Sequence, residues 1–413
     1  MIVTFVCLLN RVDGGFVVNW KRNLYFVWLS QFLSISGFSF ALPFAPFYIQ
    51  KLGVSDPVSL KMWVAVFAAV TPLALAISSP IWGILADRYG RRPMLLRAYY
   101  AGAIVLALMG LATSVEQLIV LRFIQGIFTG TVTASQTLIS AHAPEGKSGT
   151  ALGALGGAVF SGTMAGAFAG GWLAEFFGYR VAFFISGGIL LLAAVLVTIG
   201  VRERFEAPPP KRFSEGFGHG VSQLAIAGPI LMLIVALAFT RTFDQAMLPL
   251  LVQDIHGSTD GVAPWAGSLS AIGGLAGLLA CFTLGPLADR ISPARIGKWS
   301  ALGSGLLMIP QGLAEGFLML FVARFGMIFC AGGLDPVFQI WLAKVTPEKS
   351  RGFIFGWSTT AKSIGWFVAP LFGGALASAW GVRSIFFVGP LLYFALIPLI
   401  GFVVWKLLPP ERD

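Results

Sequence analysis

The sequence has 413 residues, of which 57% are hydrophobic and only 11% are charged, and its formal net charge is +10. Soluble domains carry roughly a quarter charged residues, so this composition excludes an ordinary soluble globule. Apolar stretches of roughly 20 residues, long enough to cross a bilayer as helices, recur along almost the whole chain. The composition therefore predicts an all-α membrane protein.

Hydropathy places twelve apolar segments in two groups of six, and a charged, proline-containing stretch separates the groups. We expect twelve transmembrane helices in two pseudo-symmetric six-helix bundles. The expected spans are 24–48, 61–85, 94–112, 117–140, 149–174, 180–200, 223–251, 264–288, 297–314, 317–341, 354–378 and 383–405. The expected domains are an N-terminal extension at 1–18, a first bundle at 19–200, a cytoplasmic linker at 201–222, a second bundle at 223–405 and a cytoplasmic tail at 406–413.

The basic residues of the loops are distributed unevenly between the two sides of the membrane. With the amino terminus inside, most of them fall on the cytoplasmic side, and the opposite side has only Lys51, Lys61, Arg180 and Arg383. This asymmetry satisfies the positive-inside rule and predicts that both termini are cytoplasmic. The net positive charge is thus explained without a nucleic-acid partner.

The two groups of spans repeat in sequence. GILADR, which starts at Gly83, recurs as GPLADR at Gly285, and Arg122-Phe123 recurs as Arg324-Phe325, each 202 residues later. The glycine-rich segment 166–171 is echoed by 369–374, 203 residues later. Three matches in register indicate a duplication, and repeated bundles around a central site are typical of secondary transporters.

Three motifs resemble those of a known family. GILADRYGRR at 83–92 resembles the loop between spans two and three of the major facilitator superfamily, and RFIQG at 122–126 resembles its fourth-span motif. GTMAGAFAGG at 162–171 resembles the fifth-span motif of proton-coupled antiporters, although Ala167 stands where that motif normally has proline. Together they imply the twelve-span drug:proton antiporter branch, over a region from about residue 19 to the carboxyl end.

The resemblance implies a proton-coupled transporter that exports small amphipathic compounds or drugs by alternating access across the bacterial inner membrane. Its expected partners are a small-molecule substrate, protons and the lipid bilayer, and we expect a monomer without a cofactor or metal. The sequence has no His-Glu-x-x-His motif, phosphate-binding loop or spaced Cys/His cluster, so no enzyme is expected.

Charged residues inside the spans are candidates for function, because even low estimates put the cost of a charge at the bilayer centre at about 3 kcal/mol. They are Asp244, Asp335, Arg122, Arg241, Arg324 and Lys362. We expect proton binding first at Asp244 and second at Asp335. The alternatives are structural pairs, of Asp244 with Arg241 one turn earlier and of Asp335 with Lys362 or Lys344.

By resemblance, Arg122 would lie near the proton pathway and assist proton release, and Arg324 would be its counterpart or a packing remnant of the duplication. The resemblance also assigns the loop at 83–92, which we call the signature loop, to conformational control. In this assignment Asp87 engages the start of span eleven near Gly352. Topology-setting charge is the alternative for its arginines. The assigned residues are Gly83, Asp87, Arg88, Gly90, Arg91 and Arg92.

Small residues of spans five and eleven predict close helix packing. They are Gly162, Gly166, Gly170, Gly171, Pro370, Gly373 and Gly374. For the substrate cavity we expect the aromatic residues Phe40, Phe239 and Trp357. Four bases against two acids within the spans also favour a different substrate, an organic anion such as a metabolite or siderophore. Uptake by proton symport and a non-transporting receptor remain further alternatives.

Overall fold

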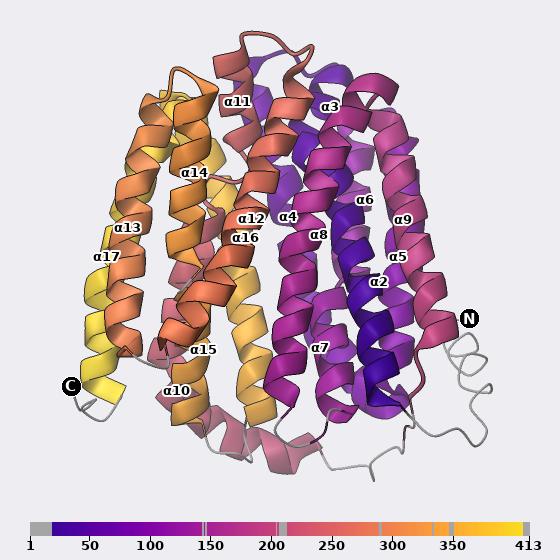
Figure 1. The fold of residues 1–413 in the computed structure, drawn as a ribbon, viewed down its shortest axis with the longest axis vertical. Coiled ribbons are helices and arrows are strands. Elements are labelled where there is room, and N and C mark those ends of the chain that lie inside the picture. The colour runs from indigo at the N-terminus through magenta and orange to yellow at the C-terminus, as the bar shows by residue number, and fades with distance from the viewer. Residues whose placement is uncertain are drawn as a thin grey trace.

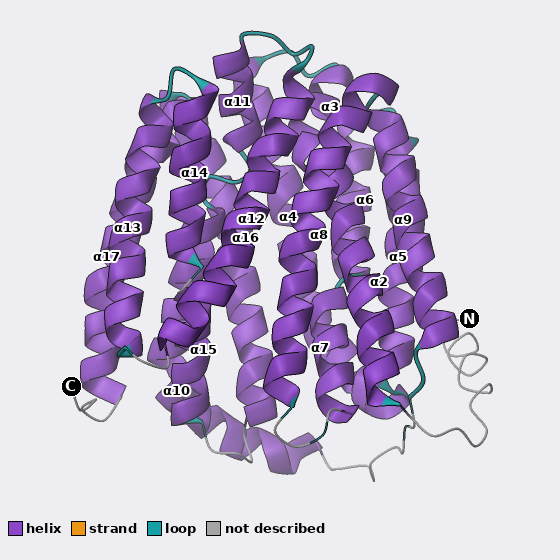
Figure 2. Cartoon of the chain, in the orientation of Figure 1, coloured by secondary structure: helices purple, strands orange, loops and turns teal. Residues whose placement is uncertain are grey.

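The computed structural model covers the whole chain and describes residues 19–142, 144, 147–203, 205, 213–288, 291–332, 334–346 and 351–407. These residues form long helices joined by short loops, with no strand among them, as Figure 2 shows. The extension predicted at 1–18 lies outside the described residues.

The first half of the chain supplies the first six predicted spans. Its first helix is capped by Asn19, whose side chain accepts hydrogen bonds from the backbone N–H groups of Lys21 and Arg22. The elements are α2 (Trp20–Ala41), η1 (Leu42–Phe44), α3 (Ala45–Lys51), α4 (Pro57–Tyr89), α5 (Arg91–Gly110), α6 (Val115–Phe128), α7 (Thr131–His142), α8 (Ser148–Phe177) and α9 (Tyr179–Gly200).

The second half supplies the other six. Its first helix begins at Phe213, so residues 213–222, which we predicted as linker, are helical. The elements are α10 (Phe213–Thr242), α11 (Leu248–His256), α12 (Val262–Ala288), α13 (Pro293–Leu313), α14 (Phe317–Ala331), α15 (Leu334–Val345), α16 (Arg351–Trp380), η3 (Val382–Ser384) and α17 (Ile385–Leu407).

Within the described residues, nine segments are long and apolar enough to span a membrane. The other three predicted spans are α10 with α11, α13, and α14 with α15. Two of these are broken into shorter pieces, whose apolar parts are Ala227–Thr242 and Phe317–Ala331. Helix α13 carries Arg295 and Lys298 near its start and several polar residues, which lower its hydropathy.

The first, fourth, seventh and tenth spans are interrupted. The first breaks at η1, which contains Pro43, and the fourth breaks at Gly130, whose φ of 111° is a conformation that glycine adopts readily. The seventh breaks at residues 243–247, and in the tenth α14 ends at Ala331 before α15 begins at Leu334. The breaks therefore fall in the first helix of each three-helix group, and interrupted helices form the central sites of many transporters.

The start of α2 and the end of α17 lie at the lower end of the molecule in Figure 1, which we call the inner end. Helices α3 and α11 lie at the opposite end, the outer end. The two halves of the chain meet along two helix pairs, α8 with α12 and α4 with α16.

The outer halves of α8 and α12 approach each other through glycines. A Cβ atom at Gly171 would lie 2.7 Å from the carbonyl oxygen of Ala263, and a Cβ at Gly274 would lie 2.8 Å from the backbone nitrogen of Met164. At Gly267 a Cβ would collide with the carbonyl oxygen of Ala167. These contacts, the glycine seam, leave no room for side chains between the two backbones.

Candidate functional site

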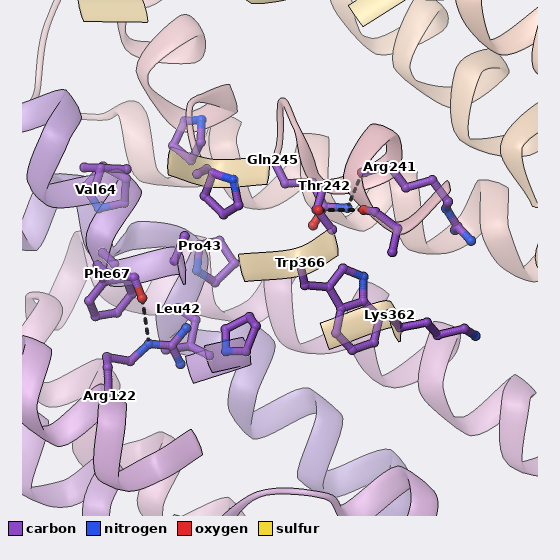
Figure 3. A pocket seen from close by; sticks show the side chains of 18 of the residues that line it. Leu42, Pro43, Val64, Phe67, Arg122, Arg241, Thr242, Gln245, Lys362 and Trp366 are labelled. Atoms are coloured by element: carbon purple, nitrogen blue, oxygen red, sulfur yellow. Dashed lines mark hydrogen bonds between the residues drawn. The ribbon is translucent and has the colours of Figure 1, made fainter. Parts of the chain in front are cut away.

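A cavity of about 520 Å³ lies between the two halves of the chain. The first half contributes the break between α2 and α3 together with parts of α4 and α6, and the second half contributes α10, the break after it, α11 and α16 (Figure 3). The lining is mostly apolar. Among the described residues it includes the cationic side chains of Arg122, Arg241 and Lys362 and no carboxylate.

Helix α6 presents Arg122 to this cavity with only 9% of the residue exposed. Its Nε donates a hydrogen bond to the carbonyl oxygen of Phe67 at 3.4 Å, and its Nη1 donates to Oε1 of Gln125 at 2.5 Å. The guanidinium carbon also lies 4.5 Å from the centroid of the Phe67 ring. Figure 3 shows Arg122 beside Leu42, across the cavity from Arg241 and Lys362. Neutral groups therefore orient Arg122.

Asp244 lies in the break between α10 and α11 and is fully buried. Its Oδ2 accepts a hydrogen bond from Nη1 of Arg324 on α14, which is 4% exposed. The same Nη1 lies 3.5 Å from Oε1 of the buried Gln311. The alternative partner considered from the sequence, Arg241, lines the cavity instead.

The second carboxylate oxygen of Asp244, Oδ1, is buried and accepts no hydrogen bond within the part of the chain that the structure describes. The pair is thus an ion pair at a helix break, and the described residues leave one of its acceptors unsatisfied. The side chains of the second predicted proton site, Asp335, and of its possible partner Lys344 lie outside the described residues.

Two glutamines join the halves at the outer end. Nε2 of Gln50 on α3 donates to Oε1 of Gln253 on α11 at 2.8 Å, and Nε2 of Gln253 donates back to Oε1 of Gln50 at 3.3 Å. Nearby, the backbone N–H of Gly261 donates to Oε1 of Glu175 at 2.9 Å. Together with the glycine seam, these contacts join the two halves at the outer end.

In the signature loop, the chain turns at Gly90, whose φ is 96°, and then enters α5. Both carboxylate oxygens of Glu203, just after α9, accept hydrogen bonds from the start of α5, from the N–H of Arg91 at 3.0 Å and of Arg92 at 2.7 Å. This site is an anion at a helix N-terminus, where orphan N–H groups need acceptors. Sequence reasoning missed Glu203, since its partner is about 110 residues away.

The other residues of the signature loop occupy different surroundings. Arg92 is buried and donates from Nη2 to the carbonyl oxygen of Thr198 at 2.9 Å, whereas Arg88 is exposed beside the ring of Tyr89. A Cβ at Gly83 would meet open space. The side chain of Asp87 lies outside the described residues, so its contact with span eleven remains a prediction.

The predicted packing glycines lie against the backbones of other helices. On α8, Gly162 faces the carbonyl oxygen of Phe32, and Gly166 and Gly170 follow along α2, while Gly171 faces α12. On α16, Gly373 faces the carbonyl oxygen of Phe243 and Gly374 faces α4. Pro370 lines the cavity. The stripe of small residues therefore contacts two helices rather than one.

The three aromatic residues predicted for the cavity lie outside its lining. Phe40 is buried against Gly170, Trp357 is 41% exposed, and Phe239 lines a smaller apolar hollow between α10 and α16. The aromatic residues of the cavity are Phe67 and Trp366.

Helical phase explains this difference. Cavity residues of α10 recur at 234, 237, 238, 241 and 242, and those of α16 recur at 362, 366 and 370. Both sets follow the spacing of one helix face, and Phe239 and Trp357 fall outside it.

Comparison with known proteins places these features in a family. The family model described as Major Facilitator Superfamily matches residues 27–310 and 234–413. Multidrug resistance protein MdtG of Escherichia coli strain SMS-3-5 is 36% identical over 374 residues, which cover 90% of this chain and 91% of that protein. MdtG of Escherichia coli strain K12 matches with the same identity and coverage.

Solved structures show the same fold at low sequence identity. The human organic anion transporter MFSD10 aligns with a TM-score of 0.71 at 15% identity, over 93% of this chain and 100% of that chain. A POT family transporter in complex with 5-aminolevulinic acid aligns with a TM-score of 0.75 at 14% identity, over 94% and 97%. These matches confirm the predicted all-α, multi-pass membrane fold. The chain therefore belongs to the Major Facilitator Superfamily and is a secondary transporter, not an enzyme.

Proposed function

We propose that this protein exports small amphipathic compounds from the bacterial cytoplasm in exchange for protons, by alternating access. The observation that carries the proposal is the cavity between the two halves, which the Gln50–Gln253 contact and the glycine seam join at the outer end. Contacts that join the halves at the outer end fit a state that loads substrate from the inner end, which we assign to the cytoplasm together with both termini. The similarity to MdtG supports drugs as substrates.

We assign proton coupling first to Asp244. Its carboxylate is fully buried at a helix break, and Oδ1 is left without a hydrogen bond among the described residues. Protonation of Asp244 would weaken its attraction to Arg324, since a neutral carboxyl group lacks the charge that holds a guanidinium. Proton binding would then change the packing of α14 against the break after α10. Asp335 and Arg122 remain secondary candidates for the proton pathway.

An exporter of an organic anion is the second candidate function. The buried guanidinium of Arg122 in the cavity lining favours it, because this charge would attract an anionic group and repel a lipophilic cation. Import by proton symport would use the same cavity, with the opposite direction of net transport.

The test is proton-gradient-driven accumulation in everted membrane vesicles, with ethidium as a cationic dye and fluorescein as an anionic dye of similar size. We expect at least one dye to accumulate in vesicles with the wild-type protein, and an uncoupler to abolish accumulation. The variant Asp244→Asn should lose it when vesicles are compared at equal amounts of correctly folded protein. Asp254 is an exposed carboxylate on the neighbouring α11. Asp254→Asn is therefore the matched control and should retain accumulation.

Two results would contradict the proposal. Accumulation of neither dye by well-folded wild-type protein would argue against export of small amphipathic compounds. Full gradient-driven accumulation in Asp244→Asn would remove Asp244 from proton coupling but leave export itself standing.

A further inference from the structure

The duplication is also seen in the contacts that glycines of α8 and α16 make with α2 and α10. A Cβ at Gly162 would lie 2.7 Å from the carbonyl oxygen of Phe32, and a Cβ at Gly365 would lie 2.6 Å from the carbonyl oxygen of Val235. Both members of the second pair follow those of the first by 203 residues. The same offset relates Gly170 and Phe40 to Gly373 and Phe243, and Gln50 to Gln253.

This correspondence places Ala41 at the position that Asp244 occupies in the second half. Arg324, the partner of Asp244, corresponds to Arg122 in the repeat. The second half thus has an aspartate–arginine pair, whereas the first half has the arginine and an alanine. Ala41 is buried and is the last residue of α2, next to Leu42, which lines the cavity beside Arg122 in Figure 3.

The contacts of Arg122 fit this reading. Each contact described above is to a neutral group, the Phe67 carbonyl oxygen, the Phe67 ring or the Gln125 amide. A guanidinium with little exposure to solvent favours an anionic partner, because its desolvation is otherwise poorly compensated. In the second half the protein supplies that partner, and in the first half the cavity is open to a ligand instead.

We propose that Arg122 binds an acidic group of the transported compound, and that the missing acid at Ala41 determines this specificity. The inference rests on the proposed role of the cavity as the substrate site. The acidic group takes the place that Asp244 holds in the other half, and the apolar walls with Phe67 and Trp366 accept the rest of the molecule. The predicted substrate class is therefore an aromatic or amphipathic carboxylate or similar anion.

The experiment measures binding without transport. Purified protein in lipid nanodiscs is titrated into fluorescein, an anion, and rhodamine 123, a cation with the same ring system, and fluorescence anisotropy gives the two affinities. We expect the wild type to prefer fluorescein. Ala41→Asp should weaken fluorescein binding about tenfold or more, since it supplies Arg122 with a carboxylate and removes a charge-assisted bond to the ligand. Ala41→Asn is the neutral control of equal size and should keep the wild-type preference.

A second variant tests the arginine itself. Arg122→Gln should weaken fluorescein binding by a similar factor without weakening rhodamine 123 binding. The inference is overturned if the wild type prefers rhodamine 123 or binds neither dye. It is also overturned if Ala41→Asp and Ala41→Asn change the affinity for fluorescein equally. Failure of the vesicle assay with intact fluorescein binding would count against proton-driven export and leave this binding site standing.

Discussion

Gln50 and Gln253 occupy equivalent positions in the two halves, 203 residues apart, and their side-chain amides hydrogen-bond to each other in both directions. Because a hydrogen bond contributes about 1 kcal/mol, we expect Gln50→Ala or Gln253→Ala to raise the population open at the outer end roughly fivefold. In the double variant this population should be only slightly larger than in either single variant, because each change alone breaks the pair.

The measurement is the rate at which a membrane-impermeant maleimide reaches a cysteine at Ala238, in the cavity lining, from the outer side. The native cysteines are first replaced by serine. Gln117→Ala is the control, because this amide contacts Thr113 in its own outer loop rather than the other half. A labelling rate that rises equally in the control would show that the effect is not specific to the pair.

Arg324→Gln should destabilise the protein by about 3 to 5 kcal/mol, because it leaves the buried carboxylate of Asp244 without its charged partner. Adding Asp244→Asn should recover much of this loss, since both charges are then absent. Thermal unfolding followed by tryptophan fluorescence compares the variants with Arg88→Gln, an exposed arginine. A double variant less stable than Arg324→Gln would disprove the coupling.

Glu203→Ala should lower stability by about 1 kcal/mol through the loss of its hydrogen bonds to the start of α5. Proteolysis of the inner end at fixed protease concentration should also become faster. Glu116 is an exposed acidic residue in the first turn of α6, and Glu116→Ala serves as the comparison. Equal protease sensitivity of the two variants would assign Glu203 no role in holding the signature loop.

Gly267→Ala should reduce transport strongly, because the added methyl group collides with the carbonyl oxygen of Ala167 across the glycine seam. Gly157→Ala on α8 should be tolerated, as a Cβ there meets nothing within 4 Å. Size-exclusion profiles separate a transport defect from misfolding. Wild-type transport by Gly267→Ala would show that the seam can separate without loss of function.

The architecture was predictable because its signals are local or periodic. Hydropathy, loop charge and the repeated motif at Gly83 and Gly285 require no knowledge of which helices touch. The partner of Asp244 was not predictable in this way, since Arg324 lies 80 residues later and Arg241 offered a nearer candidate. Tertiary packing decided between them.

The aromatic residues of the cavity differ from the predicted ones for a related reason. Within an apolar span every residue is compatible with lipid, protein or cavity, so hydrophobicity does not reveal the face that a residue occupies. Trp366 and Trp357 differ by nine residues on one helix, and only the first lines the cavity. The glutamine pair was overlooked because polar residues at span ends are ordinary in sequence.

The breaks at η1 and at residues 243–247 separate the short helices α3 and α11 from the long helices below them. A break interrupts the ladder of backbone hydrogen bonds, and such points absorb changes in backbone angle. The two short helices carry Gln50 and Gln253, so a tilt at these breaks would separate the two glutamines while α2 and α10 stay in place. Such a tilt would open the outer end without requiring a rotation of one half of the chain against the other.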